Sequence, residues 1–252
     1  MLKHKTTIIL LLLILLCLNI LNFFILVGYW YYLIPILIYF IFTAIGSFRI
    51  SSNFYFPVIC SVKTNEKQIA ISFDDGPTSD ITNKVLDILK TNDIKANFFV
   101  IGRKIVGNES ILERINKEGH IIGNHTYSHS YFFDLFLPSK MANEFAITNN
   151  LIEKFTGKQT LYFRPPYGVT NPLIKIALKK FNFSVIGWSV RSHDGIKNDT
   201  NKIIKRVTRN LKSGDIVLFH DNYPSIEKVL NEFITFTKNN GFKIVSLDTL
   251  LK

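Results

Sequence analysis

Two adjacent carboxylates and a pair of histidines about fifty residues further on are the side chains of this chain best suited to chemistry. The carboxylates are Asp74 and Asp75, in the segment 72–77 (SFDDGP), and the histidines are His125 and His129. A divalent metal of the zinc type binds imidazole nitrogen and carboxylate oxygen, and a catalytic site keeps one position open for water or substrate. Asp75 and the two histidines can supply three such ligands. Asp74 is then free to stand beside the metal and take a proton from water, as in metal-assisted hydrolysis.

Each half of this pattern has a simpler explanation when it stands alone. An Asp-Asp-Gly-Pro stretch is more often a turn with solvated carboxylates, because glycine and proline interrupt regular structure. A His-x3-His pair is as often part of a loop as a pair of ligands. The strand-like runs 68–73 and 121–123 change this balance. They deliver the aspartates and the histidines to the carboxyl ends of strands, where barrel enzymes keep their catalytic residues.

Three later segments repeat this arrangement of polar residues after an apolar run. Residues 161–163 lead to 164–168 (RPPYG), residues 184–188 lead to 191–194 (RSHD), and residues 215–219 lead to 220–221 (HD). Together the five segments resemble the five ordered motifs of the polysaccharide deacetylases, the NodB-homology or carbohydrate esterase family 4 group. The resemblance covers about residues 66–251 and is specific, because all five motifs occur in order at suitable spacing.

The resemblance implies a role for each polar residue of the first three motifs. It makes Asp74 the general base and makes Asp75, His125 and His129 the ligands of a divalent metal. Zn²⁺ is the ion expected first, with Co²⁺ or another divalent ion as alternatives. Arg164 matches the arginine that pairs with the base, where a planar guanidinium can give bidentate geometry. The simpler interpretation of Arg164, an exposed arginine beside a proline turn, leaves its place in the motif series unexplained.

The rest of the third motif and the last two motifs supply the remaining residues of the reaction that the resemblance implies. The backbone N–H of Tyr167 would donate to the tetrahedral oxyanion of amide hydrolysis. His220 would protonate the leaving amine, and Asp194 would raise its basicity, as a nearby negative charge does. Taken alone, a histidine after an apolar strand is more often a buried structural residue. The residues expected to bind substrate are Trp188, Leu218 and Pro166.

One departure from the family pattern matters for the substrate. Many members carry a tryptophan directly after the aspartate of the fourth motif, where this chain has Gly195. We therefore expect one wall of the usual substrate groove to be missing. This departure affects the shape of the substrate more than the type of reaction.

The amino-terminal end is the other large feature of the chain. No Asp, Glu, Lys or Arg occurs from residue 6 to residue 48. This stretch is about twice the roughly 20 residues needed to cross a bilayer, and it is too long for a secretory signal. We predict two transmembrane spans, near 7–27 and 33–47, joined by an aromatic turn at 28–32 (GYWYY) that suits a membrane interface. A buried core hairpin is a weak alternative, because a domain of this size does not need forty uncharged residues in succession.

Lysine and arginine residues near the spans set the expected orientation. Lys3 and Lys5 precede the first span and Arg49 follows the second, while the turn between the spans carries neither residue type. The positive-inside bias places both ends, and with them the catalytic domain, in the cytoplasm. That side suits a lipid-linked sugar as substrate. A single span with an interfacial second segment would place the domain outside, where family members act on cell-wall glycan.

The composition is consistent with this organisation but adds no further detail about the substrate. The 252 residues divide into a membrane anchor at 1–48, a linker at 49–65 and a deacetylase-like domain at 66–252, which is large enough for one core. The net charge of +11 suits anionic lipid or phosphorylated substrates. A lysine-rich solvated surface explains the charge about equally well. No nucleic-acid-binding module is recognisable, so nucleic acid is not an expected partner.

Strand and helix patterns alternate through the domain. Strands are predicted near 68–73, 95–101, 121–124, 161–164, 184–188, 215–220 and 243–246, and helices near 82–90, 110–118, 139–155, 172–180, 201–210 and 225–239. Repeated strand–helix units indicate a parallel sheet. With the family likeness, about seven such units imply an α/β fold, an irregular (β/α) barrel preceded by a transmembrane helical hairpin.

These observations predict a membrane-anchored, metal-dependent hydrolase that removes the N-acetyl group of an amino sugar. The sugar would belong to a polysaccharide, to peptidoglycan or to a lipid-linked glycan, and the expected partners are that glycan or lipid-linked sugar and membrane lipid. Two alternatives stay open: a non-catalytic glycan-binding protein of the same fold, and a deacetylase or deformylase of a small non-glycan amide. The presence of the base, the three ligands and the acid argues against the first, because degenerate members usually lose one of them.

Overall fold

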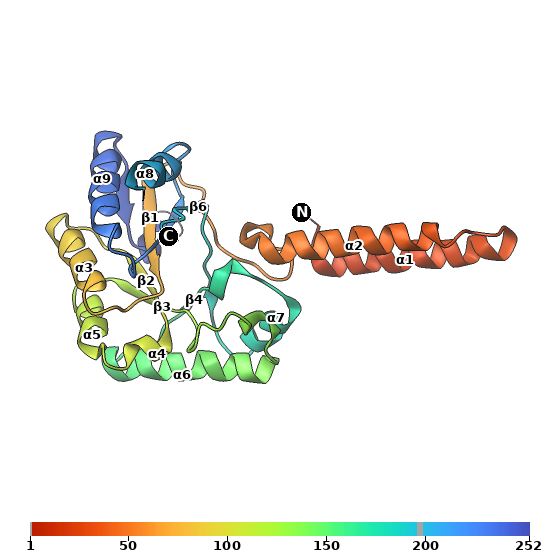
Figure 1. Cartoon of the computed structure of the whole chain (residues 1–252), viewed down its shortest axis with the longest axis horizontal. Helices are drawn as coiled ribbons and strands as arrows, with labels where there is room; N and C mark the ends of the chain where they lie inside the picture. The colour runs from red at the N-terminus through yellow and green to blue at the C-terminus, as the bar shows by residue number, and fades with distance from the viewer. Residues whose placement is uncertain (1, 196–198) are drawn as a thin grey trace.

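The chain folds into a helical hairpin and an α/β domain, and the hairpin projects from the domain as a rod (Figure 1). The computed structural model describes residues 2–195 and 199–252. The hairpin consists of α1 (His4–Phe24) and α2 (Trp30–Phe48), and both helices are long and apolar enough to cross a membrane. Their ends lie within three residues of the two predicted spans.

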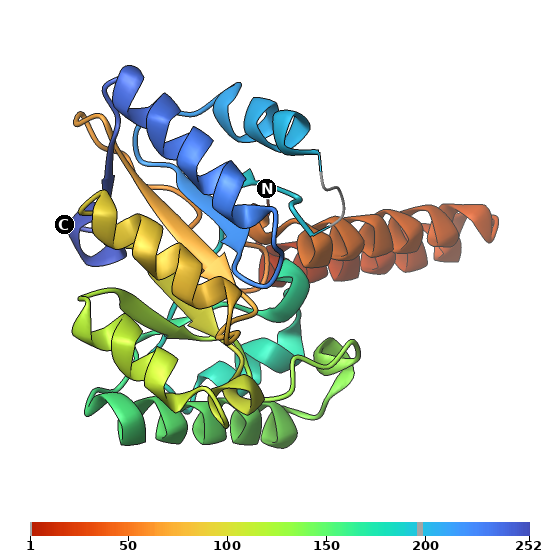
Figure 2. The same cartoon turned by 60° about the vertical axis from the view of Figure 1, so that its left-hand side comes forward.

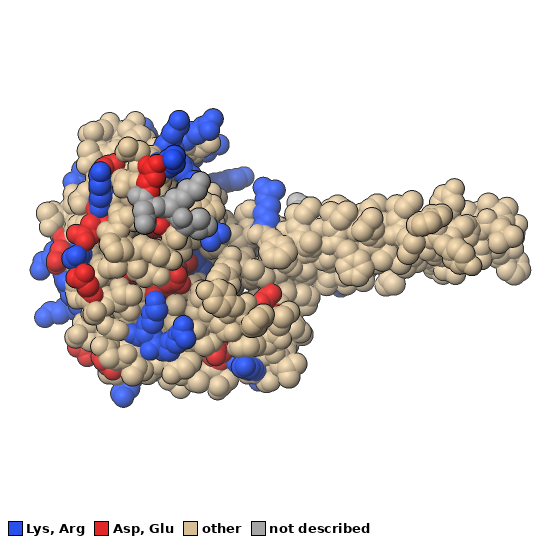
Figure 3. Space-filling model, in the orientation of Figure 1, with Lys and Arg blue, Asp and Glu red and all other residues tan. Residues whose placement is uncertain are grey.

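The surface of the rod is apolar over its whole length. Most of its large apolar side chains are exposed, and Phe23, Leu26 and Tyr29 near the far turn are almost completely so. The space-filling view shows charged side chains gathered on the domain and none along this face of the rod beyond its base (Figure 3). A helix that is apolar on all sides requires an apolar environment.

Within the described residues, the domain is built on one eight-stranded sheet whose paired strands run parallel. The strands are β1 (Gln68–Asp74), β2 (Asn97–Val100), β3 (Ile121–Asn124), β4 (Tyr162–Phe163), β5 (Ser184–Val185), β6 (Val190–Arg191), β7 (Ile216–His220) and β8 (Lys243–Val245). Their order is β5-β4-β3-β2-β1-β7-β6, and β8 pairs with the first half of β1. The sheet curls with helices on its outer side into an incomplete barrel (Figure 2). This arrangement confirms the predicted irregular (β/α) barrel.

Six helices longer than one turn and a half surround the sheet in the described part of the chain, and they correspond to the six predicted ones. They are α3 (Ile81–Thr91), α5 (Glu109–Lys117), α6 (Pro138–Thr156), α7 (Pro172–Leu178), α8 (Thr200–Thr208) and α9 (Ile226–Asn239). The shorter α4 (Gly102–Ile105) and α10 (Leu247–Leu250), and the 3-10 turns η1 (Ile50–Ser52), η2 (Phe133–Leu135) and η3 (Pro166–Gly168), were not predicted. Asn171 caps the start of α7, because its side chain accepts a hydrogen bond from the N–H of Ile174 at 2.8 Å and Pro172 follows at the first helical position.

All seven predicted strands are present, and β6 is an additional one. Only four residues separate it from the end of β5, which is too few for two separate apolar runs to be distinguished in the sequence. Its two residues pair with Val217 and Leu218 of β7. The predicted strand at 184–188 therefore shortens to β5, and the chain crosses to the other edge of the curled sheet within a few residues.

The alternation of side chains along β1 separates the core from the site. Ile69, Ile71 and Phe73 point outward and are buried in the core beneath α3 and α9. Successive residues of a strand point to opposite faces, so Ser72 and Asp74 point into the barrel. β1 therefore carries Asp74 to the carboxyl end of the sheet inside the barrel, as the sequence predicts.

The segment between α2 and β1 packs against the domain. Its buried apolar residues Phe54, Tyr55, Phe56, Val58 and Cys60 form a cluster with residues of α6, α7, β4 and β5. Ile59 also forms a parallel bridge with Ile186 just beyond β5. These residues belong to the core beside the barrel, and the division of the chain at residues 48 and 65 stays a prediction.

Candidate active site

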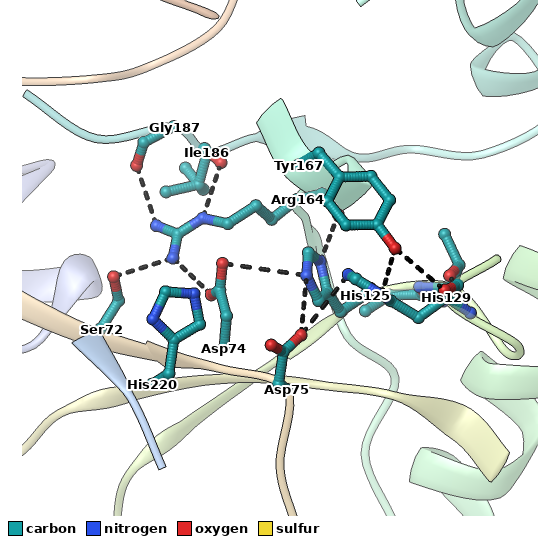
Figure 4. A network of polar contacts seen from close by, with 12 residues as sticks. Ser72, Asp74, Asp75, His125, His129, Arg164, Tyr167, Ile186, Gly187 and His220 are labelled. Carbon is teal, nitrogen blue, oxygen red and sulfur yellow. Dashed lines mark hydrogen bonds and ion pairs between the residues drawn. The ribbon is translucent and has the colours of Figure 1, made fainter. Parts of the chain in front are cut away.

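Asp75, His125 and His129 meet at the carboxyl ends of β1 and β3 (Figure 4). Asp75 Oδ1 lies 3.7 Å from His125 Nε2 and 3.4 Å from His129 Nε2. Asp75 Oδ1 is buried, and it accepts no hydrogen bond from any residue that the structure describes. A buried carboxylate oxygen that accepts no hydrogen bond destabilises the fold. Its position beside two imidazole nitrogens therefore indicates that a cation binds between the three atoms. One carboxylate oxygen and two imidazole nitrogens fit a divalent ion of the zinc type.

Hydrogen bonds at Nδ1 orient both imidazole rings. His125 Nδ1 lies 2.7 Å from the carbonyl oxygen of Arg164. A carbonyl can only accept, so Nδ1 carries the hydrogen and Nε2 keeps its lone pair toward Asp75. His129 Nδ1 lies 3.3 Å from the hydroxyl of Tyr167, which also donates to the carbonyl oxygen of His129 at 3.4 Å. Burial, reinforced by the charge of His125, lowers the pKa of His129 to about 3, which favours the neutral ring that a metal requires.

Strained backbone concentrates around these ligands. Asp75, Thr126, His129, Tyr167 and His193 all have φ between 48° and 74°. Residues other than glycine rarely adopt this left-handed backbone conformation, and each such residue destabilises the fold by about 1–3 kcal/mol. Thr126 is the most unusual of them because its side chain is β-branched. Strain of this kind persists where the surrounding structure fixes the loop, and it is typical of functional sites.

Glu144 of α6 fixes the loop that carries the two histidines. Its Oε2 accepts hydrogen bonds from the N–H of Tyr127 at 3.0 Å, the N–H of Ser128 at 2.7 Å and the hydroxyl of Ser128 at 2.9 Å. This carboxylate belongs to a helix for which the sequence pattern predicts only an amphipathic helix. Sequence reasoning missed it, and no local signal would have found it.

Arg164 and Asp74 form a buried ion pair, as predicted, but with a different geometry. Arg164 is completely buried, and its Nη1 donates to Asp74 Oδ1 at 2.6 Å and to Ser72 Oγ at 2.9 Å. Its remaining donors go to the carbonyl oxygens of Ile186, at 3.1 Å from Nε, and Gly187, at 2.8 Å from Nη2. The expected bidentate contact is therefore wrong, because the other edge of the guanidinium is used to fix the arginine to the strand end.

The second oxygen of Asp74 faces the cluster of ligands. Asp74 Oδ2 lies 3.8 Å from His125 Nε2, on the side away from Arg164. Asp74 thus stands between the guanidinium and the three ligand atoms (Figure 4). The carboxylate has one oxygen held by the arginine and one available to a molecule bound beside the ligands.

His220, at the end of β7, pairs with Asp194. His220 Nδ1 lies 2.6 Å from Asp194 Oδ1, and the backbone N–H of His220 donates to Asp194 Oδ2 at 2.9 Å. The hydroxyl of Ser192 donates to Asp194 Oδ1 at 2.8 Å and completes the support of this buried carboxylate. Burial alone would lower the pKa of His220, but the hydrogen bond and charge of Asp194 outweigh it, and Asp74 and Asp75 add to them, so the pKa lies above its ordinary value.

These groups share one cleft of about 170 Å³. The predicted substrate residues Trp188 and Leu218 line it together with Asp74, Asp75, His125, His129 and His220. Pro166 is buried in η3 and does not line the cleft, so the structure does not bring this predicted substrate residue to the site. Arg191, His193 and Tyr223 line the cleft and were not predicted.

Tyr223 stands beside Gly195, where we expected a wall to be missing. A Cβ placed on Gly195 would lie 2.8 Å from Tyr223 Cε2 and 2.9 Å from its hydroxyl oxygen. A side chain at residue 195 would therefore require the tyrosine ring to move, and in this structure the ring occupies the space beside the glycine. The wall is therefore formed in part by a residue from the loop after β7.

Comparisons with known proteins identify the family of this chain. A family model described as polysaccharide deacetylase matches residues 61–186, which include Asp74, Asp75, His125, His129 and Arg164. A peptidoglycan-N-acetylglucosamine deacetylase of Bacillus cereus is 35% identical over 204 residues, which cover 77% of this chain and 93% of that protein. The peptidoglycan-N-acetylglucosamine deacetylase PgdA of Listeria monocytogenes is 33% identical over 194 residues, which cover 77% of this chain. The chain spans 41% of the length of that relative.

A solved structure with the same fold comes from a CE4 family pseudoenzyme of Bacillus anthracis, in a mutant form with restored enzymatic activity. It superposes with a TM-score of 0.72 at 29% sequence identity and covers 78% of this chain and 71% of the other. The fold of this chain therefore occurs in that group both with and without activity, so the side chains of the site have to decide the chemistry.

Proposed function

The chain belongs to the polysaccharide deacetylase family, as its five motifs predicted, and we propose that it hydrolyses the N-acetyl amide of an amino sugar in a glycan. The observation that carries the proposal is the position of Asp74, between the guanidinium of Arg164 and the three converging ligand atoms. The relatives from Bacillus cereus and Listeria monocytogenes are peptidoglycan-N-acetylglucosamine deacetylases, which supports an N-acetylglucosamine-containing glycan as the substrate.

Asp75, His125 and His129 hold a divalent metal in this proposal, with Zn²⁺ first and Co²⁺ or another divalent ion as alternatives. When bound, such an ion polarises the acetyl carbonyl and makes water more acidic. The hydrogen bond from His125 Nδ1 to a carbonyl oxygen leaves Nε2 of that ring facing Asp75, and His129 Nε2 lies 3.4 Å from the same carboxylate oxygen. The ligands are therefore already oriented by the protein.

Asp74 acts as the base in the attack of water on the acetyl carbon. Its Oδ2 faces the ligand cluster and accepts the proton of the water, while Oδ1 stays bonded to Arg164. The guanidinium is itself fixed by two backbone carbonyls, so the carboxylate is held in one orientation. Fixed geometry of this kind supplies a large part of the rate enhancement of an enzyme.

The tetrahedral species formed by this attack carries a negative oxygen and an amine that must leave. No described residue accepts a hydrogen bond from the backbone N–H of Tyr167, which is therefore free to donate to that oxygen. His220, whose pKa Asp194 raises against the effect of burial, gives its proton to the amine nitrogen as the carbon–nitrogen bond breaks. The products are acetate and the free amino sugar. Trp188 and Leu218 enclose the acetyl methyl group in this arrangement.

The hairpin is the membrane anchor of the enzyme in this proposal. Its two apolar helices and their exposed apolar surface support membrane insertion. Lys3, Lys5 and Arg49 lie at the same end of the rod as the domain, and the far turn carries no Lys or Arg. This distribution favours a domain on the cytoplasmic side.

Acetate release by the purified, detergent-solubilised protein tests the function. The substrates are N-acetylated chitooligosaccharide, peptidoglycan and a small acetylated or formylated amine, each with Zn²⁺ present. Release from the glycans by the wild type, and its loss in Asp74→Asn, is the expected result. Retention of glycan without acetate release would instead favour the non-catalytic alternative that the pseudoenzyme relative brings forward. Release from the small amide alone would favour the other alternative, a deacetylase or deformylase of a small non-glycan amide.

A further inference from the structure

A second hollow, of about 240 Å³, adjoins the catalytic cleft on the side of the hairpin. One wall is formed by residues 48–51, the end of α2 and the start of η1, and the other by Tyr167, Trp188, Ser189 and Arg191. Tyr167, Trp188 and Arg191 also line the catalytic cleft. The anchor thus contributes a wall to a space that leads directly to the site.

The chemistry of this hollow is that of an anion site. Its lining carries the guanidinium groups of Arg49 and Arg191 and the hydroxyl of Ser51, and it includes no carboxylate. The hydroxyl of Ser189, also in the lining, donates to Asp215 Oδ1 at 2.7 Å and is not counted among the donors for a ligand. Arg49 Nε donates to Ser51 Oγ at 3.4 Å, and Arg191 lies against the ring of Trp188, 5.3 Å from its centroid.

Arg191 has an unmet need for an acceptor. Its Nε is buried, and no described residue accepts a hydrogen bond from it. A buried N–H without an acceptor is costly. No described residue therefore fixes the guanidinium of Arg191, which lines the hollow and can turn its donors toward a ligand there. Guanidinium groups bind phosphate through paired N–H donors.

Hydrogen bonds between the anchor and the active-site loop hold the hollow in place. The N–H of Thr170 donates to the carbonyl oxygen of Ser47 at 3.0 Å, and its hydroxyl donates to the carbonyl oxygen of Gly46 at 3.1 Å. Thr170 lies three residues after Tyr167, so the end of α2 is tied to the loop that carries the proposed oxyanion donor. Gly46 packs so closely on Phe54 that a Cβ there would lie 2.2 Å from its ring.

The position of the hollow along the chain indicates its level relative to a membrane. The apolar helix α2 ends at Phe48, and Arg49 follows directly. An arginine at the end of a transmembrane helix lies at the level of the lipid headgroups. An anion bound there lies between the bilayer surface and the catalytic cleft.

Resting on the proposed deacetylase function, we infer that Arg49 and Arg191 form a subsite for a phosphate group, and that the substrate is an N-acetylated amino sugar joined through that phosphate to a membrane lipid. The acetylated sugar occupies the cleft beside Asp74, and the phosphate lies in the hollow. The hydrocarbon chain extends into the bilayer along the outside of α2. A phosphate on a soluble sugar shares the same chemistry, and the experiment separates the two sources.

The test compares three probes with the full-length, zinc-loaded enzyme in detergent micelles. They are N-acetylglucosamine linked through phosphate to a polyprenyl chain, N-acetylglucosamine 1-phosphate, and a neutral N-acetylglucosamine tetramer. We expect kcat/KM for acetate release to fall in that order. Arg49→Gln and Arg191→Gln should each lower the ratio of kcat/KM for the lipid-linked and neutral probes about 10-fold, the effect of losing a charge-assisted hydrogen bond. Arg49→Lys and Arg191→Lys should recover part of that ratio.

Lys243→Gln is the matched control, because Lys243 is exposed on β8, at the opposite end of β1 from the site. It removes one positive charge and should leave the ratio unchanged. A ratio that stays the same in both arginine variants would overturn the subsite while leaving the deacetylase function in place. Equal preference for the lipid-linked and soluble phosphates would overturn the assignment of the lipid.

Binding provides a readout that does not depend on turnover. Calorimetry with Asp74→Asn should show binding of the lipid-linked probe, and the double variant Asp74→Asn/Arg191→Gln should bind about 10-fold more weakly. If the wild type releases acetate from no probe but this difference in binding is present, the proposed function fails and the subsite stands. Equal binding by the single and double variants would overturn the subsite. Thermal unfolding of each variant establishes that it is folded.

Discussion

The guanidinium of Arg164 donates to the carboxylate of Asp74 at 2.6 Å, and both side chains are excluded from solvent. This ion pair contributes both to the stability of the barrel and to the proposed reaction, because the same contact neutralises a buried charge and orients the proposed base. Removing one partner of a buried pair leaves the other charge without compensation, which costs about 3–5 kcal/mol.

Replacing Arg164 should therefore affect folding and turnover together. We expect Arg164→Met to lower the free energy of unfolding by about 3–5 kcal/mol and to abolish acetate release. Denaturant unfolding followed by tryptophan fluorescence measures the first, and an acetate assay the second. Arg209→Met, at an exposed position after α8, is the control and should change the unfolding free energy by less than about 0.5 kcal/mol. Wild-type turnover in Arg164→Met would contradict the role given to the pair.

Removing one ligand should release the metal. We expect His129→Ala to lose zinc affinity by about 10-fold or more, because one of three protein ligands is gone. Zinc content after dialysis, measured by atomic absorption, is a readout independent of activity. His193→Ala removes another histidine of the same cleft that is not among the ligands, and it should retain zinc. Chelation should abolish wild-type activity, and Zn²⁺ or Co²⁺ should restore it; full activity of metal-free enzyme would refute the site.

The pH dependence of the reaction should follow the Asp194–His220 pair. The pKa of His220 is raised, so the protonated acid persists to higher pH and the rate falls as pH rises through that pKa. In Asp194→Asn the hydrogen bond to a negative charge is lost and the pKa of His220 falls. The alkaline limb of kcat/KM should then move to lower pH. Glu232→Gln, on the solvent side of α9, should leave the profile in place, and an unmoved limb in Asp194→Asn would remove His220 from the role of acid.

The sequence predicts the ligands and the base because they follow directly on strands. Asp74, Asp75 and His125 need only the end of a parallel strand to reach the same edge of the sheet, and strand patterns are local. Long-range contacts are different. Glu144 contacts the histidine loop from α6, and Tyr223 contacts Gly195 from the loop after β7. Neither contact can be predicted from the residues next to these positions in the sequence.

Arg164 shows the same limit within a correct prediction. Its motif indicates the partner, Asp74, but the carbonyl oxygens of Ile186 and Gly187 take the donors that bidentate pairing would need. Those carbonyl oxygens lie close to the guanidinium of Arg164 because β5 ends early and the chain then crosses to β6. The strand pattern alone does not show where such a crossing occurs.

The shape of the cleft beside Gly195 can be tested by exchange. Gly195→Trp introduces the residue common in the family, and its side chain would collide with Tyr223. We expect kcat/KM on glycan to fall about 10-fold, since misplaced groups near the reacting atoms are costly. The double variant Gly195→Trp/Tyr223→Ala removes the obstacle and should recover most of the loss. If Gly195→Trp alone has wild-type kinetics, the tyrosine does not form the wall.

The orientation of the anchor decides which glycans the cleft can reach. Lys3, Lys5 and Arg49 lie at one end of the two apolar helices, and the turn between the helices carries no Lys or Arg, so the domain should remain in the cytoplasm. A reporter fused after Lys252 should be active only in a form that works in the cytoplasm. Replacing Arg49 with Glu and adding two lysines to the turn should shift molecules toward the outward form, because Lys and Arg near the ends of the spans carry the bias. Activity of the wild-type fusion only outside would refute the inward orientation and move the substrate to cell-surface glycan. If the charge reversal shifts nothing, hydrophobicity or translocation of the folded domain sets the orientation instead.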